Sequence, residues 1–205
     1  MATTYLHDTF TDTDTTLLTS HTMNTGGGWT SHVGLWTITS NQAGNTLTTN
    51  WQMITADSAQ TYVSVSADLT TSSQAGGTHF APGVLGRFVD VDNHFKLYIH
   101  SATNELILAD VIAGAFTQRA AGAVTLAATT TYNVKLVMRG TLILGFVDGV
   151  QLLSYTDSGG PNGTRTGIAE FRNPGAGSMN NPNQFDNFLT TDPPGGGTLL
   201  LMGVG

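Results

Sequence analysis

Short runs of alternating hydrophobic and polar residues follow one another along most of the chain, separated by clusters of Gly, Asn, Asp and Ser. Alternation with a period of two predicts β-strands, because successive side chains of a strand point to opposite faces of the sheet. The turn clusters recur at the spacing of an all-β sandwich, and no helical pattern of useful length appears. The predicted strands are 5–10, 35–39, 46–49, 60–69, 83–89, 94–100, 105–111, 132–139, 142–147, 150–155, 165–171 and 183–189. Strands of this number and length fit two packed sheets.

The clearest alternation is GVLGRFVDVDNHFKLYIH, residues 83–100, which predicts two strands and a turn. In the second strand one face is apolar and the other is polar or aromatic. The apolar face consists of Phe95, Leu97 and Ile99, and the opposite face consists of His94, Lys96, Tyr98 and His100. We therefore predict that the first face is buried in a core and that the second is equipped to contact another molecule.

Residues 132–155 predict a three-stranded antiparallel meander. Asp148-Gly149 is a two-residue connection of the kind that accepts positive φ at both central positions of a hairpin. Arg139-Gly140-Thr141 separates the first two strands in a similar way. Because the three strands are almost continuously apolar, we expect the meander near the centre of one sheet.

Several short motifs follow one another in a recognisable order. They are DTF at 8–10, GLWTIT around Trp36, NTL at 45–47, VSVSADL at 63–69, GRFVDVDNHFKLYI, YNVKLVMRG, FVDGVQLL, GIAEF at 167–171 and FDNF at 185–188. Together they resemble the concanavalin A-like jelly roll, in particular its laminin-G-like and glycosidase-associated modules, over roughly residues 5 to 190. The resemblance implies an all-β fold, an antiparallel two-sheet jelly-roll β-sandwich.

In such a fold the first and last strands pair, which would bring DTF and FDNF together. We expect Phe10, Phe185 and Phe188 to seal that edge of the sandwich, and Trp36 to lie in the core. The superfamily hosts lectins, glucanases, adhesion modules and virion proteins, so the fold alone does not choose a function.

We divide the chain into a jelly-roll domain, residues 1–192, and a Pro/Gly linker with an apolar tail, residues 193–205. The tail, TLLLMGVG, is too short to cross a bilayer and would expose apolar side chains if it were free. We predict that it docks into a groove or adds a strand to a neighbouring subunit. The residues expected to make this assembly contact are Leu199, Leu200, Leu201, Met202 and Val204.

Composition narrows the classes of partner. The formal charge is −7, and only Lys96 and Lys135 are lysines, which argues against a nucleic-acid partner. The chain has no cysteine, so neither disulfides nor thiolate metal sites can form. The N-terminus lacks the basic and apolar regions of a secretory signal, and no run approaches the ~20 apolar residues of a membrane span. We expect synthesis in the cytoplasm without a signal peptide.

The sequence offers no catalytic pair of carboxylates. Glycosidases on this fold need two closely placed acids, and the glucanase branch carries them on one strand as Glu-x-Asp-x-x-Glu or a variant. The chain has only Glu105 and Glu170, and neither has a carboxylate partner at i+2 or i+4. Asp90 and Asp92 are two apart but occupy a turn, where Asp stabilises the backbone. We predict that the protein is not an enzyme and assign no catalytic residue.

Metal binding has weak support. The histidines show no HExxH or His-x-x-x-His spacing for zinc. If the termini pair, Asp8 and Asp186 could converge with the aspartates of TDTDTT as oxygen ligands for calcium. The alternative is a solvated loop, so calcium is allowed here but left unassigned, and no cofactor is predicted.

The candidate ligand-binding residues are Arg87, His94, Lys96, Tyr98 and His100. Aromatic rings stack on sugars, and Arg, Lys and His donate to hydroxyls or pair with acidic groups. The alternative is an ordinary polar outer face of a sheet. The loop 171–184, rich in Asn, Gly and Pro, is a second candidate surface.

Two functions from different classes follow. The first is a non-catalytic structural or decoration protein on the surface of a bacteriophage-like virion or similar particle, anchored by its tail in a homo-oligomer or capsid-like assembly and able to contact a cell-surface glycan. The second is a free carbohydrate-binding, lectin-like module. A glycoside-active enzyme is least favoured.

Overall fold

Two antiparallel sheets form the molecule, as a computed structural model of the chain shows. The structure describes residues 2–45, 50–71, 80–172 and 184–194, and these residues form fifteen strands and no helix. The strands are β1 (Thr4–Asp8), β2 (Thr30–Val33), β3 (Trp36–Thr39), β4 (Gln42–Asn45), β5 (Asn50–Asp57), β6 (Val63–Thr70), β7 (Phe80–Asp90), β8 (Asn93–His100), β9 (Glu105–Ile112), β10 (Ala115–Ala123), β11 (Thr131–Arg139), β12 (Leu142–Val147), β13 (Val150–Thr156), β14 (Arg165–Arg172) and β15 (Gln184–Thr191). The predicted all-β sandwich is confirmed.

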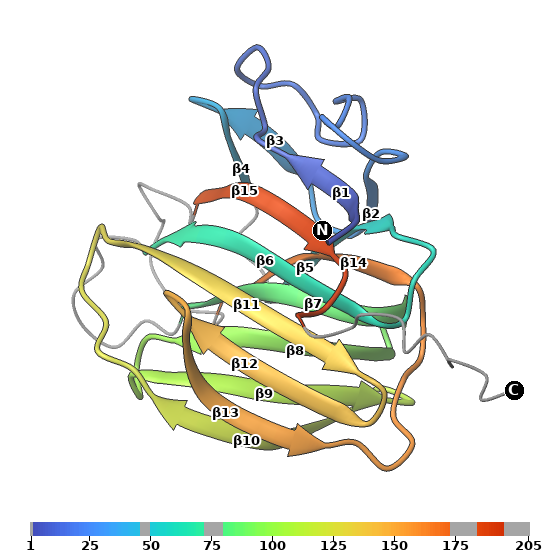
Figure 1. The fold of residues 1–205 in the computed structure, drawn as a ribbon. Helices are drawn as coiled ribbons and strands as arrows, with labels where there is room; N and C mark the ends of the chain where they lie inside the picture. The colour runs from blue at the N-terminus through green and yellow to red at the C-terminus, as the bar shows by residue number, and fades with distance from the viewer. Residues whose placement is uncertain (1, 46–49, 72–79, 173–183, 195–205) are drawn as a thin grey trace, which may run out of the picture.

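The sheets lie face to face. Sheet A has eight strands in the order β13-β12-β11-β6-β15-β4-β3, with β1 paired to β15, and sheet B has seven in the order β10-β9-β8-β7-β14-β5-β2. Figure 1 views the sandwich from the side of sheet A, with sheet B behind it. The described residues contain no helix that is long and apolar enough to cross a membrane.

The core lies between the two sheets and follows the predicted phase of β8. Phe95, Leu97 and Ile99 are at most 1% exposed and belong to the main hydrophobic cluster. Trp36 belongs to the same cluster and meets Phe185 edge-on, with ring centroids 5.7 Å apart. Both core predictions are confirmed.

The first and last strands of the described chain pair, as the resemblance implied. Asp8 of β1 lies opposite Phe188 of β15, and Phe10 and Phe188 are both fully buried. Trp29 lies between them, with its ring centroid 5.9 Å from that of Phe10 and 4.8 Å from that of Phe188. This aromatic group closes the edge of the sandwich where the chain begins and ends.

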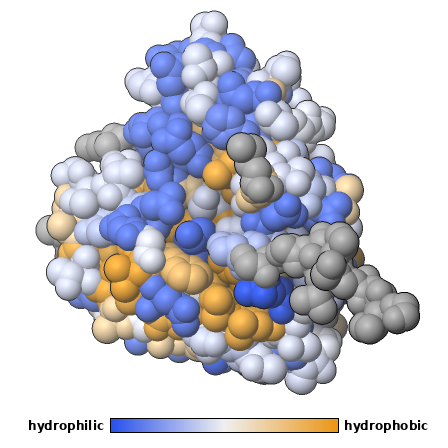
Figure 2. Space-filling model, in the orientation of Figure 1, coloured by the Kyte–Doolittle hydropathy of each residue, from blue (hydrophilic) through white to orange (hydrophobic). Residues whose placement is uncertain are grey.

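The meander β11-β12-β13 is present, but it lies at one end of sheet A, with β13 at the edge. The prediction that it occupies the centre of a sheet was wrong. Figure 2, in the orientation of Figure 1, shows hydrophobic side chains gathered over these strands. Val150, which is 60% exposed, contributes to this apolar character. The apolar residues of the meander therefore lie partly in the core and partly on the exposed outer face of sheet A.

Four strands, β2, β4, β5 and β10, escaped the sequence pattern for different reasons, and β4 has only four residues. β5 carries Gln52, Met53, Ile54 and Thr55, all buried, so that no polar face marks it. β10 is exposed along most of its length and lacks an apolar face. β2 is only four residues long. The predicted strand 46–49 and the assembly residues 199–204 lie outside the described residues.

A buried network fastens the N-terminal segment to the sandwich. Asp8 is fully buried and accepts hydrogen bonds from Phe10 N, His21 Nε2 and Trp29 Nε1, at 2.9, 2.9 and 2.7 Å. His21 Nδ1 lies 3.0 Å from Asp12 Oδ2. Because each imidazole nitrogen faces a carboxylate, His21 is best satisfied as the doubly donating imidazolium. Burial opposes this charge, but the hydrogen bonds to Asp12 and Asp8 outweigh it and raise the pKa of His21 above 6.5.

We predict that His21→Gln lowers the free energy of unfolding by about 1 to 3 kcal/mol near pH 6, because it removes two charge-assisted hydrogen bonds. Because the pKa of His21 is raised in the folded state, its contribution to the free energy of unfolding is complete below pH 6.5. That contribution is lost as the pH rises through the folded-state pKa. The hydrogen bond from His21 lowers the pKa of Asp12. The contribution of Asp12 to the free energy of unfolding is therefore complete above pH 3.8 and is lost as the pH falls through its folded-state pKa.

Urea unfolding at several pH values measures this effect. The difference from the native chain should be largest between about pH 4 and 6.5 and should shrink by pH 9. A difference that does not change with pH would show that His21 acts only by packing.

Candidate functional site

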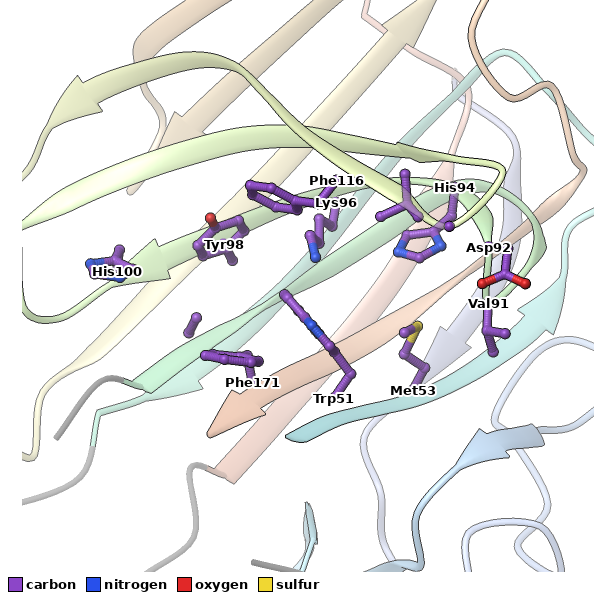
Figure 3. A pocket seen from close by; sticks show the side chains of 13 residues that line it. Trp51, Met53, Val91, Asp92, His94, Lys96, Tyr98, His100, Phe116 and Phe171 are labelled. Carbon is purple, nitrogen blue, oxygen red and sulfur yellow. The ribbon is translucent and has the colours of Figure 1, made fainter. Parts of the chain in front are cut away.

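A groove with a volume of about 450 Å³ lies on the outer face of sheet B, on the opposite side of β8 from the core. Its described lining comes from six strands, β5, β7, β8, β9, β10 and β14, and from the β7-β8 and β9-β10 turns (Figure 3). The described lining residues are Trp51, Met53, Ala81, Val91, Asp92, His94, Lys96, Tyr98, His100, Val111, Gly114, Phe116 and Phe171. A volume of this size is typical of small-molecule pockets.

Strand alternation places the predicted residues of β8 in this groove. His94, Lys96, Tyr98 and His100 all line it, so the structure brings four of the five candidates together. Yet this face is not an ordinary exposed sheet surface, because His94, Lys96 and Tyr98 are only 0%, 2% and 6% exposed. Aromatic side chains from β5, β10 and β14, which are not adjacent to β8 in the sheet, reach over this row.

Those aromatic walls were missed by the sequence reasoning as site residues. Trp51 and Phe171 stand on one side of the β8 row and Phe116 on the other (Figure 3). The ring centroids of Trp51 and Phe171 are 4.7 Å apart, and Trp51 meets Tyr98 edge-on at 6.4 Å. The alternation of Trp51, Met53 and Thr55 is the one signal that could have marked β5, but Gln52 and Ile54 between them are buried as well, so no exposed polar face marks the strand.

Small residues on the neighbouring strands leave room for the groove. Ala81 of β7 and Ala109 of β9 pack against Tyr98 in a small outer cluster. Gly83 is paired with Tyr98, and a Cβ at Gly83 would lie 2.6 Å from the Cβ of Tyr98. A larger residue at position 83 would therefore displace Tyr98 from the floor.

Lys96 is the central polar group of the groove. Its Nζ lies 3.0 Å from the ring centroid of Trp51, 4.6 Å from that of Phe116 and 5.8 Å from that of Tyr98. No hydrogen-bond acceptor or acidic group pairs with Nζ in the described part of the chain. Burial lowers the pKa of Lys96 to about 6, so that the amine is largely neutral at pH 7.

His94 offers the complementary function. Its Nδ1 lies 3.2 Å from the carbonyl oxygen of Asp90, to which it donates, and its ring stacks on Phe88 at 5.5 Å. Burial first, and then the nearby charge of Lys96, lower the pKa of His94 to about 4. The neutral ring therefore carries its proton on Nδ1, and Nε2 is a buried acceptor without a partner among the described residues.

Tyr98 and His100 continue the row. Burial, reinforced by Glu105, raises the pKa of Tyr98 to about 12, so its hydroxyl stays protonated and can donate. His100 lies at the end of the row, where its Nδ1 is 2.9 Å from the Thr103 hydroxyl.

Arg87, the fifth candidate, does not line the groove. It has a positive φ of 45° within an irregular stretch of the β7-β8 pairing, and this reverses the alternation of β7. Its guanidinium donates to the carbonyl oxygens of Thr61 and Gly140, and lies 3.5 Å from Asp157. Arg87 therefore joins three loops at one end of the sandwich, and we no longer propose it as a ligand-binding residue.

The candidate metal ligands have structural partners instead. All the oxygen contacts of Asp8 described above go to the His21 and Trp29 network. Burial raises the pKa of Asp186, which lies on β15. Within the described ranges there is no group of three or more His, Asp or Glu that could hold a metal ion. Calcium stays unassigned.

The two glutamates lie on opposite faces of sheet B. Glu105 shares the phase of Ile107 and Ala109, which lie in the outer cluster, whereas Glu170 shares the phase of Ile168 in the core. Their strands are also separated by β7 and β8, a spacing of roughly 14 Å. Asp90 stabilises the β7-β8 turn by accepting from Asp92 N and Asn93 Nδ2. Of the second candidate surface, loop 171–184, only the first two and the last residue are described.

No protein-family model and no curated protein sequence matches the chain. Solved structures do resemble it. The carbohydrate binding module CBM66 from Bacillus subtilis has a TM-score of 0.58 at 15% identity, over 83% of this chain and 94% of that one. A protein of unknown function with a galectin-like fold, also from B. subtilis, has a TM-score of 0.56 at 14% identity, over 80% and 89%.

A GlcNAcα1-4Gal releasing endo-β-galactosidase from Clostridium perfringens has a TM-score of 0.58 at 12% identity, over 94% of this chain and 63% of that one. At such identities the likeness shows the fold alone. The fold is that of the concanavalin A-like jelly roll, as the order of motifs predicted.

We predict that Lys96→Met raises the free energy of unfolding at pH 7 by on the order of 2 kcal/mol, because folding buries an amine that water solvates in the unfolded chain. Between pH 6 and 10.5 the unfolded chain binds the lysine proton and the folded one does not, so native stability should rise with pH in this window.

The advantage of Lys96→Met should therefore shrink as the pH approaches 10, which urea unfolding from pH 7 to 10 would measure. Lys135→Met is the matched control, because Lys135 is the only other lysine and lies in β11 of sheet A. Equal effects of the two substitutions would contradict the assignment.

Proposed function

We propose that the protein is a non-catalytic carbohydrate-binding module that holds a saccharide in the groove of sheet B. The observation that carries the proposal is the pairing of aromatic walls with polar groups that have no hydrogen-bond partner among the described residues. Trp51, Phe116 and Phe171 supply the walls, and Lys96 and His94 supply the polar groups.

The walls suit the apolar faces of a sugar ring. An aromatic ring presents a large, rigid contact area with little loss of conformational entropy on binding. Trp51 and Phe171 form one continuous aromatic surface, and Phe116 lies across the groove from it (Figure 3). Phe116 is half exposed, so this wall remains open to an incoming ligand.

The polar groups suit hydroxyls. Lys96 Nζ can donate, and His94 Nε2 can accept, so a hydroxyl pair on neighbouring sugar carbons can satisfy both. Leaving a buried donor or acceptor unpaired costs about 1 to 3 kcal/mol, which a ligand that pairs them recovers. Tyr98 adds a further donor beside Lys96.

The structural neighbours support this function over assembly on a particle. One neighbour is named as a carbohydrate binding module, and the shared fold covers nearly all of it. The virion or decoration hypothesis depends on the tail, of which residues 195–205 lie outside the described structure. We therefore take carbohydrate binding as the main proposal.

The proposal that the protein is non-catalytic rests on the positions of its carboxylate side chains. Asp92 is the only carboxylate among the described lining residues, and Glu105 and Glu170 face opposite sides of sheet B. Glycosidases place two carboxyl groups ~5 to 9.5 Å apart on either side of the scissile bond. Some neighbours, the endo-β-galactosidase among them, are glycoside hydrolases, but this acid arrangement does not fit glycoside hydrolysis by two carboxyl groups.

We expect Trp51→Ala to weaken saccharide binding about tenfold or more, because it removes one aromatic wall, whose stacking and apolar contact with the sugar are together worth about 1.4 kcal/mol or more. Retardation in native gels that contain soluble polysaccharides, followed by calorimetry on the best ligand, would measure this. Tyr62→Ala is the control, since Tyr62 is 57% exposed and does not line the groove. Equal binding by Trp51→Ala and the native chain would place the site elsewhere.

We also expect no release of reducing ends from a panel of β-glucans and related polysaccharides. Turnover that disappears in Glu170→Gln or Glu105→Gln, with folding retained, would overturn the non-catalytic proposal.

A further inference from the structure

We propose that the saccharide is acidic, with a hexuronate carboxylate that pairs with Lys96 Nζ in the groove. This inference rests on the proposed function and names the class of ligand.

The first step is the lack of a counter-ion. Lys96 is 2% exposed, yet its Nζ contacts only aromatic rings, and no hydrogen bond or ion pair to it is found in the described residues. Buried lysines are normally paired. Here the N–H donors of the amine are left for a ligand, in the middle of the groove (Figure 3).

The second step concerns the surrounding charges. The titratable residues that face Lys96 from β8 are His94 and Tyr98, which are neutral at pH 7, and the contacts from β5 and β10 are Trp51 and Phe116. Asp92 lies beyond His94, at the turn end of the groove (Figure 3). His100 lies at the opposite end, and the charge of Glu105 acts on Tyr98. A carboxylate over Lys96 therefore meets no acidic side chain at contact distance among these groups.

The third step is the stoichiometry of charge. One ammonium balances one carboxylate, and the faces of Trp51 and Phe116 attract the charged form of the amine rather than the neutral one. The acceptor at His94 Nε2 then pairs with a hydroxyl beside the carboxylate, because it would repel a second anionic oxygen. A hexuronate carries both groups on one ring.

Binding should take up a proton. Burial holds the pKa of Lys96 at about 6 in the free protein, and a bound carboxylate favours the charged amine and raises that pKa. Between pH 8 and 6 the affinity should increase as the pH falls, by up to about tenfold per unit for one linked proton. A neutral saccharide would show little of this dependence.

The experiment uses the full chain and matched ligands, namely oligomers of galacturonate, mannuronate and glucuronate, each beside its methyl ester. The ester keeps the ring and removes the charge. We expect at least one acid to bind at least tenfold more tightly than its ester, and Lys96→Met to reduce acid binding to the level of the ester. Lys135→Met should bind like the native chain.

Calorimetry in phosphate and Tris at pH 7.5 would count the protons, because the two buffers differ in ionisation enthalpy. We expect an uptake approaching one proton per bound acid in the native chain, and none in Lys96→Met. Folding of each variant is checked by its urea unfolding.

The outcomes separate the two proposals. Acids and esters bound equally, without proton uptake, would overturn the acidic ligand and leave the carbohydrate-binding function intact. Binding confined to the neutral polysaccharides of the gel panel would do the same. Failure of every acidic and neutral saccharide to bind would overturn both.

Discussion

Sheet B has to bury both of its faces, and the site depends on how it does so. One face packs against sheet A in the main core, where Phe95, Leu97 and Ile99 contribute. No strand of the described residues packs over the other face, so its own side chains cover one another. Trp51 of β5, Phe171 of β14 and Phe116 of β10 do this from both sides of β8, and in doing so they bury Lys96 and leave a groove. The groove is thus a consequence of covering a sheet face with aromatic rings rather than with a second layer.

The position of Lys96 is costly for the free protein and useful for a binding site. An amine surrounded by Trp51, Phe116 and Tyr98 is desolvated, and within the described parts of the chain no acidic partner compensates for the loss. Perturbed lysines and unpaired buried acceptors such as His94 Nε2 concentrate at functional sites, because a ligand supplies the missing contacts. The other polar groups of the protein show the contrast, since Asp8 and Arg87 are both satisfied by the chain itself.

The edge of the sandwich opposite β10 and β13 is stabilised in a different way. The first and last strands pair there, and Phe10, Trp29 and Phe188 fill the space beside them. The network of Asp8 and His21 holds the intervening segment without a disulfide, in a chain that has no cysteine. Ionic hydrogen bonds and aromatic packing here do the work that cross-links do in many small β-proteins.

The features that the sequence by itself determined follow from short stretches of the chain and their order. The period of two along β8 predicted which side chains enter the core and which face away, and the order of motifs predicted the jelly roll. The position of β5 was hidden, because both of its faces are buried and polar Gln52 interrupts the pattern. Only the tertiary structure placed Trp51 over Lys96 and turned Arg87 away from the groove through a backbone irregularity. Alternation is set by the geometry of one strand, whereas burial, pKa and the shape of a groove depend on side chains from strands that are far apart in the sequence.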